Sequence, residues 1–122
     1  MKIAVIDNEK GILLSISIFL EMEKHEVYTF NLPLEAIKCI PELSIDIIIL
    51  DLYMPEINGD DIVKIFRSNH KTKDIPIILF SAHDNIFKIA KGLEVQGIIK
   101  KPFIFKELIE LINKILINDK SN

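Results

Sequence analysis

Apolar residues along this chain fall into two alternating patterns, namely short continuous runs and longer segments with helical spacing. The short runs span residues 3–6, 27–30, 47–50, 77–80 and 98–99. Each run is rich in β-branched or aromatic residues, which is typical of buried strands. Because these runs are apolar throughout and do not alternate with polar residues, they indicate strands of a parallel sheet that is covered on both faces.

The longer segments predict five helices. They span residues 11–23, 33–40, 60–68, 85–93 and 105–117. Pro33 suits the first turn of a helix, where its missing N–H costs nothing. Ile62, Ile65 and Phe66 have the i, i+3, i+4 spacing that places apolar side chains on one face of a helix.

Strands and helices alternate five times, which predicts an α/β domain with a (βα)5, doubly wound architecture. Right-handed crossovers place helices on both faces of the sheet. A common strand order for such sheets is 2-1-3-4-5, with the ligand crevice at the carboxyl ends of the first and third strands. We expect one domain over residues 1–117, followed by a polar tail at residues 118–122.

Polar residues follow four of the predicted strands. Asp7 and Asn8 follow the first, Asp51 the third, Ser81 the fourth and Lys101 the fifth. Each residue alone is more often a turn or helix-capping residue. Because the carboxyl ends of parallel strands meet at one edge of a sheet, the four positions together favour a chemical site.

This set of side chains suits phosphoryl transfer to a carboxylate. A carboxylate can act as nucleophile and form an acyl phosphate, and Asp51 occupies the position for it. Neighbouring acids require a cation, and Mg²⁺ fits because it binds through one or two carboxylates, waters and phosphate oxygens. A lysine and a hydroxyl would then hold the transferred oxygens, since catalysis of this reaction is mostly positioning and charge stabilisation.

Length and composition exclude several other classes of protein. The 122 residues suit one domain, and 49% hydrophobic with 27% charged residues is typical of a globular chain. A net charge of −3 gives no overall attraction for nucleic acid. No apolar stretch approaches the ~20 residues that span a bilayer, and the single cysteine excludes an internal disulfide. We therefore expect a soluble cytoplasmic domain.

Three segments resemble the receiver domain of two-component response regulators, the CheY-like family. They are "LDLYMPEINGDDIVKIFR", "ILFSAH" and "IKKPF", and the resemblance covers residues 2–117. It implies a flavodoxin-like fold in which Asp51 accepts a phosphoryl group from a phosphohistidine of a sensor histidine kinase or phosphotransfer protein. It also implies that Ser81 moves toward the phosphate, that Lys101 contacts it, and that Asp7, Asp51 and the Tyr53 carbonyl bind Mg²⁺.

The sequence departs from the family pattern in three places. Asn8 replaces a second acid that contacts the metal, so we expect weaker Mg²⁺ binding through a neutral amide oxygen. Ile98 replaces the aromatic switch residue, which puts the usual output mechanism in doubt. The segment between Ser81 and Lys101 is shorter than is common, so we expect a reduced fourth helix.

The resemblance also implies surfaces for regulation and partners. Tyr53 and His83 would flank the phosphate and slow its hydrolysis. Ile12 and Leu13 would form a docking patch for the histidine-bearing partner, because one face of their helix cannot bury all its apolar residues. A homodimer through the face formed by segments 85–93, 98–99 and 105–117 is a further expectation.

Two other readings compete with a phosphorylated receiver. Asn8 and Ile98 favour a pseudo-receiver, which would bind proteins without being phosphorylated, whereas Asp51, Ser81 and Lys101 oppose it. A phosphatase that uses Asp7 as nucleophile would leave Asp51 without a role. Nucleotide-binding glycine motifs are missing from the sequence. We expect a signalling phosphoacceptor, not an enzyme with turnover.

Overall fold

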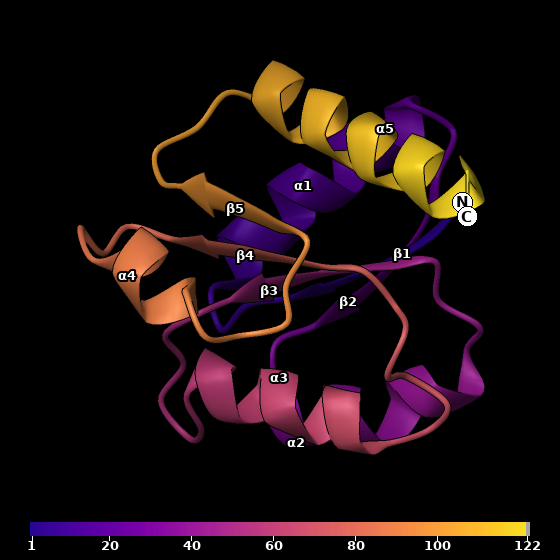
Figure 1. The fold of residues 1–122 in the computed structure, drawn as a ribbon. Coiled ribbons are helices and arrows are strands. Elements are labelled where there is room, and N and C mark those ends of the chain that lie inside the picture. The colour runs from indigo at the N-terminus through magenta and orange to yellow at the C-terminus, as the bar shows by residue number, and fades with distance from the viewer. Residues whose placement is uncertain (122) are drawn as a thin grey trace.

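The computed structural model describes the backbone of residues 1–121 and the side chains of residues 1–118, and it contains a five-stranded parallel sheet (Figure 1). The strands are β1 (Lys2–Ile6), β2 (Glu26–Phe30), β3 (Ile47–Asp51), β4 (Ile77–Ser81) and β5 (Gly97–Lys100). The helices are α1 (Lys10–Met22), α2 (Pro33–Cys39), α3 (Gly59–Ser68), α4 (Ile86–Ala90) and α5 (Phe105–Ser121). The strand order is β2-β1-β3-β4-β5, so the predicted fold class is confirmed.

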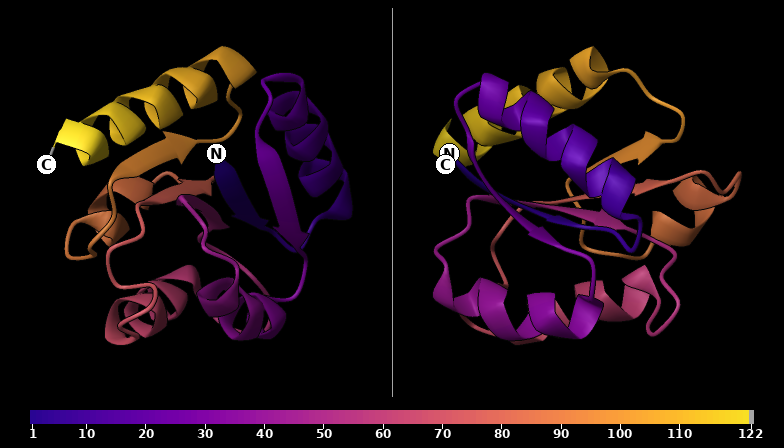
Figure 2. Two further views of the ribbon diagram at one scale, coloured as in Figure 1. Left: turned by 90° about the vertical axis from the view of Figure 1, so that its right-hand side faces the viewer. Right: turned by 180° about the vertical axis from the view of Figure 1, so that it is seen from behind.

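Helices cover both faces of the sheet, with α1 and α5 on one side and α2, α3 and α4 on the other (Figure 2). Successive strand residues point to opposite faces. Ile48 and Leu50 therefore enter the core beneath α2, α3 and α4, whereas Ile47 and Ile49 enter the core beneath α1 and α5. Two covered faces explain why these strands are apolar throughout.

The helix boundaries differ from those predicted, by only one residue in α1 and α3 and in the following ways in the other three helices. Helix α2 ends at Cys39 and continues as a 3-10 turn, Ile40–Glu42, because Pro41 cannot donate the hydrogen bond that an α-helix needs. Helix α4 ends at Ala90, ahead of Gly92, and has five residues. Helix α5 extends to Ser121, so residues 118–121 of the expected tail are helical, and Asn122 lies outside the described residues.

Within the described part of the chain, none of the helices combines the length and the apolar character that crossing a bilayer requires. The longest, α5, has 17 residues and buries one face against the sheet through Leu108, Ile112 and Ile115. Its apolar residues thus belong to the protein core.

Candidate phosphoacceptor site

The strands bring Asp7, Asp51 and Lys101 together at the carboxyl edge of the sheet. Each lies two residues beyond a strand residue that packs in the core beneath α1 and α5, so all three side chains lie toward that face. The Lys101 Nζ atom is 3.2 Å from Asp7 Oδ2 and 3.9 Å from Asp51 Oδ2. The predicted convergence of two acids and a lysine is therefore present.

The two carboxylates are buried and are oriented by backbone amides of their own loops. Asp7 is 0% exposed and Asp51 is 6% exposed. Asp7 Oδ1 accepts a hydrogen bond from the Glu9 N–H at 2.9 Å, and Asp51 Oδ1 accepts one from the Tyr53 N–H at 3.3 Å. These bonds hold the carboxylates at the ends of β1 and β3, where the loops leave the sheet.

Ser81 is buried at the end of β4, and its side chain points to the opposite face of the sheet from that of Asp51. It follows Ile77 and Leu79, which pack in the core beneath α2, α3 and α4. Its Oγ accepts a hydrogen bond from the His83 N–H at 3.1 Å. The hydroxyl is thus held by its own loop, at the same edge of the sheet as the carboxylates.

The charges of the site do not balance. The pKa of Asp51 is raised to about 6, first by burial and then by the nearby Asp7 carboxylate, while Lys101 acts in the opposite direction. Two carboxyl groups share one ammonium group, so the site carries a net negative charge when both acids are ionised, and a bound cation would offset it.

The donor set at this edge fits Mg²⁺, although it is poorer in acids than a three-carboxylate site. Within residues 1–118 no group of three His, Cys, Asp or Glu side chains is arranged to hold a metal ion. Mg²⁺ usually keeps several waters and needs one or two carboxylates. Asp7 and Asp51 could supply these, and the exposed Asn8 and Tyr53, one and two residues after them in the chain, could add an amide and a carbonyl oxygen.

The side chains of Tyr53 and His83 contact each other across the loops that follow β3 and β4. Their ring centroids are 5.0 Å apart, and Tyr53 is 42% exposed. His83 Nδ1 accepts a hydrogen bond from the Asn85 N–H at 3.1 Å, which fixes the ring orientation. The loops after β3 and β4 therefore meet over the carboxyl edge.

Gly59 sets the path of the loop that follows Asp51. Its N–H donates to the Leu52 carbonyl at 2.7 Å, and a Cβ at this position would lie 2.7 Å from Leu52 Cα. Only glycine permits this approach of two backbone segments. The close contact starts α3 directly beside the residue after Asp51.

Ile98 lies on β5 opposite Leu79. Its side chain is half-buried and packs against the core beneath α2, α3 and α4. It occupies the same face of the sheet as Ser81. The structure thus places a branched aliphatic side chain at the position of the expected aromatic switch.

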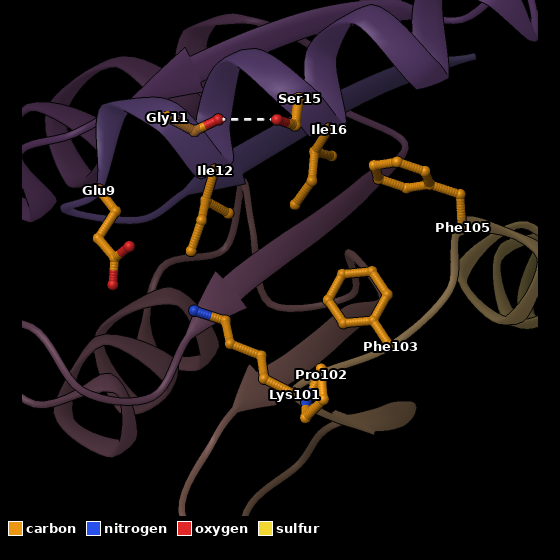
Figure 3. Close-up of a pocket in the computed structure, with 9 residues that line it drawn as sticks. All are labelled: Glu9, Gly11, Ile12, Ser15, Ile16, Lys101, Pro102, Phe103 and Phe105. Atoms are coloured by element: carbon orange, nitrogen blue, oxygen red, sulfur yellow. Dashed lines mark hydrogen bonds between the residues drawn. The ribbon is translucent and has the colours of Figure 1, made fainter.

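A groove of about 630 Å³ adjoins the site between α1 and the loop from β5 to α5 (Figure 3). Ile12 and Ile16 line it from α1, and Lys101, Phe103 and Phe105 line it from the other side. Sequence reasoning missed Phe103 and Phe105, although both closely follow the "KKP" signal.

The prediction that Leu13 belongs to an exposed docking patch is wrong. Leu13 is 6% exposed and packs in the core with Ile16 and Leu20, because the i, i+3, i+7 positions of α1 face the sheet. Ile12 does reach the surface, where it lines the groove. The exposed apolar residues of α1 are instead Leu14, Ile18 and Met22.

Comparison with known proteins identifies relatives along nearly the whole chain. The family profile described as "Response regulator receiver domain" matches residues 3–113. The response regulator SaeR of Staphylococcus epidermidis is 37% identical over 123 residues, which cover 97% of this chain and 52% of that protein. SaeR of Staphylococcus aureus is 36% identical over 116 residues, covering 92% and 49%. The chain thus spans about half the length of these curated relatives.

Solved structures share the fold. A receiver domain protein from Clostridium thermocellum has a TM-score of 0.87 at 31% identity, covering 98% of this chain and 96% of that one. The chemotaxis protein CheY4 of Vibrio cholerae has a TM-score of 0.86 at 26% identity, covering 93% and 96%. Together with the family match over residues 3–113, these likenesses show that the chain belongs to the response regulator receiver domain family of two-component signalling proteins.

Proposed function

We propose that this domain accepts a phosphoryl group on Asp51 from a phosphohistidine of a sensor kinase or phosphotransfer protein, and that phosphorylation changes its protein contacts. The observation that carries the proposal is the position of the Asp51 carboxylate, buried at the end of β3 with the Lys101 ammonium 3.9 Å away and Asp7 beside both. The retained Asp51, Ser81 and Lys101 favour phosphorylation over the pseudo-receiver alternative. The domain would be a signalling phosphoacceptor without turnover of an external substrate.

In the proposed step an Asp51 oxygen attacks phosphorus while the bond from phosphorus to the histidine nitrogen breaks. The leaving imidazole nitrogen keeps the electron pair of that bond and takes a proton from solvent. Lys101 and the Ser81 hydroxyl would hold the transferred oxygens, which need positioning more than covalent chemistry. Mg²⁺, held by Asp7, Asp51, Asn8 and the Tyr53 carbonyl, would supply positive charge.

The groove beside α1 supports docking of the histidine-bearing partner. Its walls are mostly apolar, and it opens next to Lys101, so a partner helix seated there would bring its histidine to the site. Of the two α1 residues predicted to contact the partner, Ile12 lines this groove and is the contact that we propose. We also propose a homodimer through the face of α4, β5 and α5, because Phe87 of α4 and Ile104, the residue before α5, are exposed. Since Ile98 is aliphatic, the signal would reach this face without rotation of an aromatic ring at that position.

Intact-mass spectrometry tests the proposed function. We expect the wild type to gain the mass of one phosphoryl group on incubation with phosphoramidate and Mg²⁺, and Asp51→Asn to gain none. A wild type that stays unmodified, or a mutant that gains the same mass, would reject a phosphoacceptor at Asp51.

Asn8→Asp should strengthen Mg²⁺ binding. A second carboxylate on the loop after β1 adds a negative charge beside Asp7 and Asp51, and we expect roughly tenfold tighter binding, or about 1.4 kcal/mol. Isothermal titration calorimetry with MgCl₂ would measure it. Asn31→Asp adds an acid after β2 at the same edge and serves as control. Equal affinities of Asn8→Asp and wild type would contradict the role given to Asn8.

Tyr53→Ala should shorten the life of the aspartyl phosphate. Removing the ring that contacts His83 opens the rim of the site to water, and we expect roughly fivefold faster hydrolysis, equivalent to about 1 kcal/mol in the barrier. Decay of the phosphorylated mass after removal of the donor gives the half-life. Tyr28→Ala, on the edge strand β2, is the matched control, and an unchanged half-life in Tyr53→Ala counts against the proposal.

A further inference from the structure

Phe80 contacts the lysine of the site, and its position in the strand explains how. It is the residue before Ser81 at the end of β4, is 1% exposed, and packs in the core beneath α1 and α5. It therefore lies on the same face of the sheet as Asp7, Asp51 and Lys101. The Lys101 Nζ atom lies 4.5 Å from the centre of the Phe80 ring, within the range in which an ammonium group is attracted to an aromatic face.

Phe80 stands at the end of a row of four aromatic rings, in which only Phe103 contacts it directly. Phe103 meets it edge to face, with centroids 6.2 Å apart and planes at 90°, and Phe105 meets Phe103 in the same way at 6.4 Å. Phe105 in turn stacks on Phe19 of α1 at 4.3 Å. Figure 3 shows Phe103 near Lys101 in the groove, and Phe105 farther from Lys101, near Ile16 of α1. The edge-to-face contact with Phe103 restricts rotation of the Phe80 ring, whose face lies toward the ammonium group.

We propose that Phe80 is a positioning residue for Lys101 in the phosphoryl transfer described above, on which this inference rests. A lysine ammonium is a point charge on a flexible four-carbon stem, so its place must be set by its neighbours. Asp7 draws it from one side at 3.2 Å, and the Phe80 ring supports it from another. With both contacts the ammonium stays 3.9 Å from Asp51, where the phosphoryl oxygens would arrive.

A Phe80→Leu substitution separates this role from simple core filling. Leucine keeps the site apolar but offers no ring face, so we expect affinity for beryllofluoride with Mg²⁺, a mimic of the phosphoryl group, to fall roughly three- to tenfold. Phe66→Leu is the matched control, because Phe66 is equally buried but packs on the other face of the sheet, in the core beneath α2, α3 and α4. Its affinity for the mimic should match that of the wild type. Bound beryllofluoride is measured by fluorine NMR.

A double substitution provides the readout that a structural role would not change. In the Lys101→Ala background, Phe80→Leu should have no further effect on mimic affinity, because the group it positions is gone. If Phe80→Leu is unfolded, Phe103→Leu takes its place and should show a smaller loss of the same sign, which also vanishes in Lys101→Ala.

The possible outcomes distinguish the positioning role of Phe80 from the proposed phosphoacceptor function. A wild type that fails to bind the mimic overturns both. Normal binding by the wild type together with equal losses in Phe80→Leu and Phe66→Leu overturns the positioning role alone. Additive losses in Phe80→Leu and Lys101→Ala do the same, since they would show that the ring acts independently of the lysine.

Discussion

Lys101→Ala should slow phosphorylation of Asp51 by phosphoramidate roughly 100-fold. The Lys101 Nζ atom lies within 4 Å of both Asp7 and Asp51, and removal of one preorganised group that stabilises developing charge costs about this much. The substitution also leaves the two buried carboxylates without their shared cation, so folding must be checked by circular dichroism. The rate of mass gain under a fixed donor concentration measures the effect.

Lys100→Ala is the control for this experiment. Lys100 is the preceding residue, but it lies on the other side of β5 and pairs with the exposed Asp84 at 2.8 Å. Its loss should leave the rate close to that of the wild type, because exposed ion pairs contribute little. Equal rates in Lys101→Ala and Lys100→Ala would remove Lys101 from the proposed mechanism.

Asp51→Asn should stabilise the fold at neutral pH in the absence of Mg²⁺. The pKa of Asp51 is raised to about 6, so the folded protein resists ionising this carboxyl group. Its contribution to the free energy of unfolding is full below the ordinary pKa and is lost as pH rises toward 6. The neutral amide avoids this loss, and we expect a gain of roughly 2 kcal/mol at pH 7.

Urea unfolding in EDTA at pH 7 and pH 4 would measure this gain. It should shrink toward zero at pH 4, where the Asp51 carboxyl is protonated in the folded wild type. Asp84→Asn is the control, since Lys100 lowers the pKa of that exposed carboxyl and its neutralisation should not stabilise the fold. An Asp51→Asn protein that is less stable than the wild type at pH 7 would contradict the charge imbalance described for the site.

Most of the fold and the centre of the site could be predicted because they depend on strand pattern alone. A continuous apolar run indicates a strand covered on both faces, and the residue that follows it must lie at the carboxyl edge. Asp7, Asp51 and Lys101 met this condition, and their distances confirm that they converge.

Details of packing explain both the prediction that failed and the features that the sequence did not predict. Leu13 was expected at the surface because α1 has apolar residues on most sides, and only the angle at which the helix lies on the sheet decides which of them are buried. The contact between Lys101 and Phe80 joins two strands through ring orientation, which no spacing along the chain encodes. The groove beside α1 likewise depends on how the loop after β5 places Phe103 and Phe105.

Locating the phosphoryl group tests the central claim most directly. Treating the phosphorylated protein with borohydride reduces an aspartyl phosphate to homoserine, and peptide mass spectrometry then identifies the modified position. The account predicts homoserine at position 51 and an unmodified aspartate at position 7. Reduction at Asp7, at another acid, or at none after a confirmed gain of phosphoryl mass would contradict it.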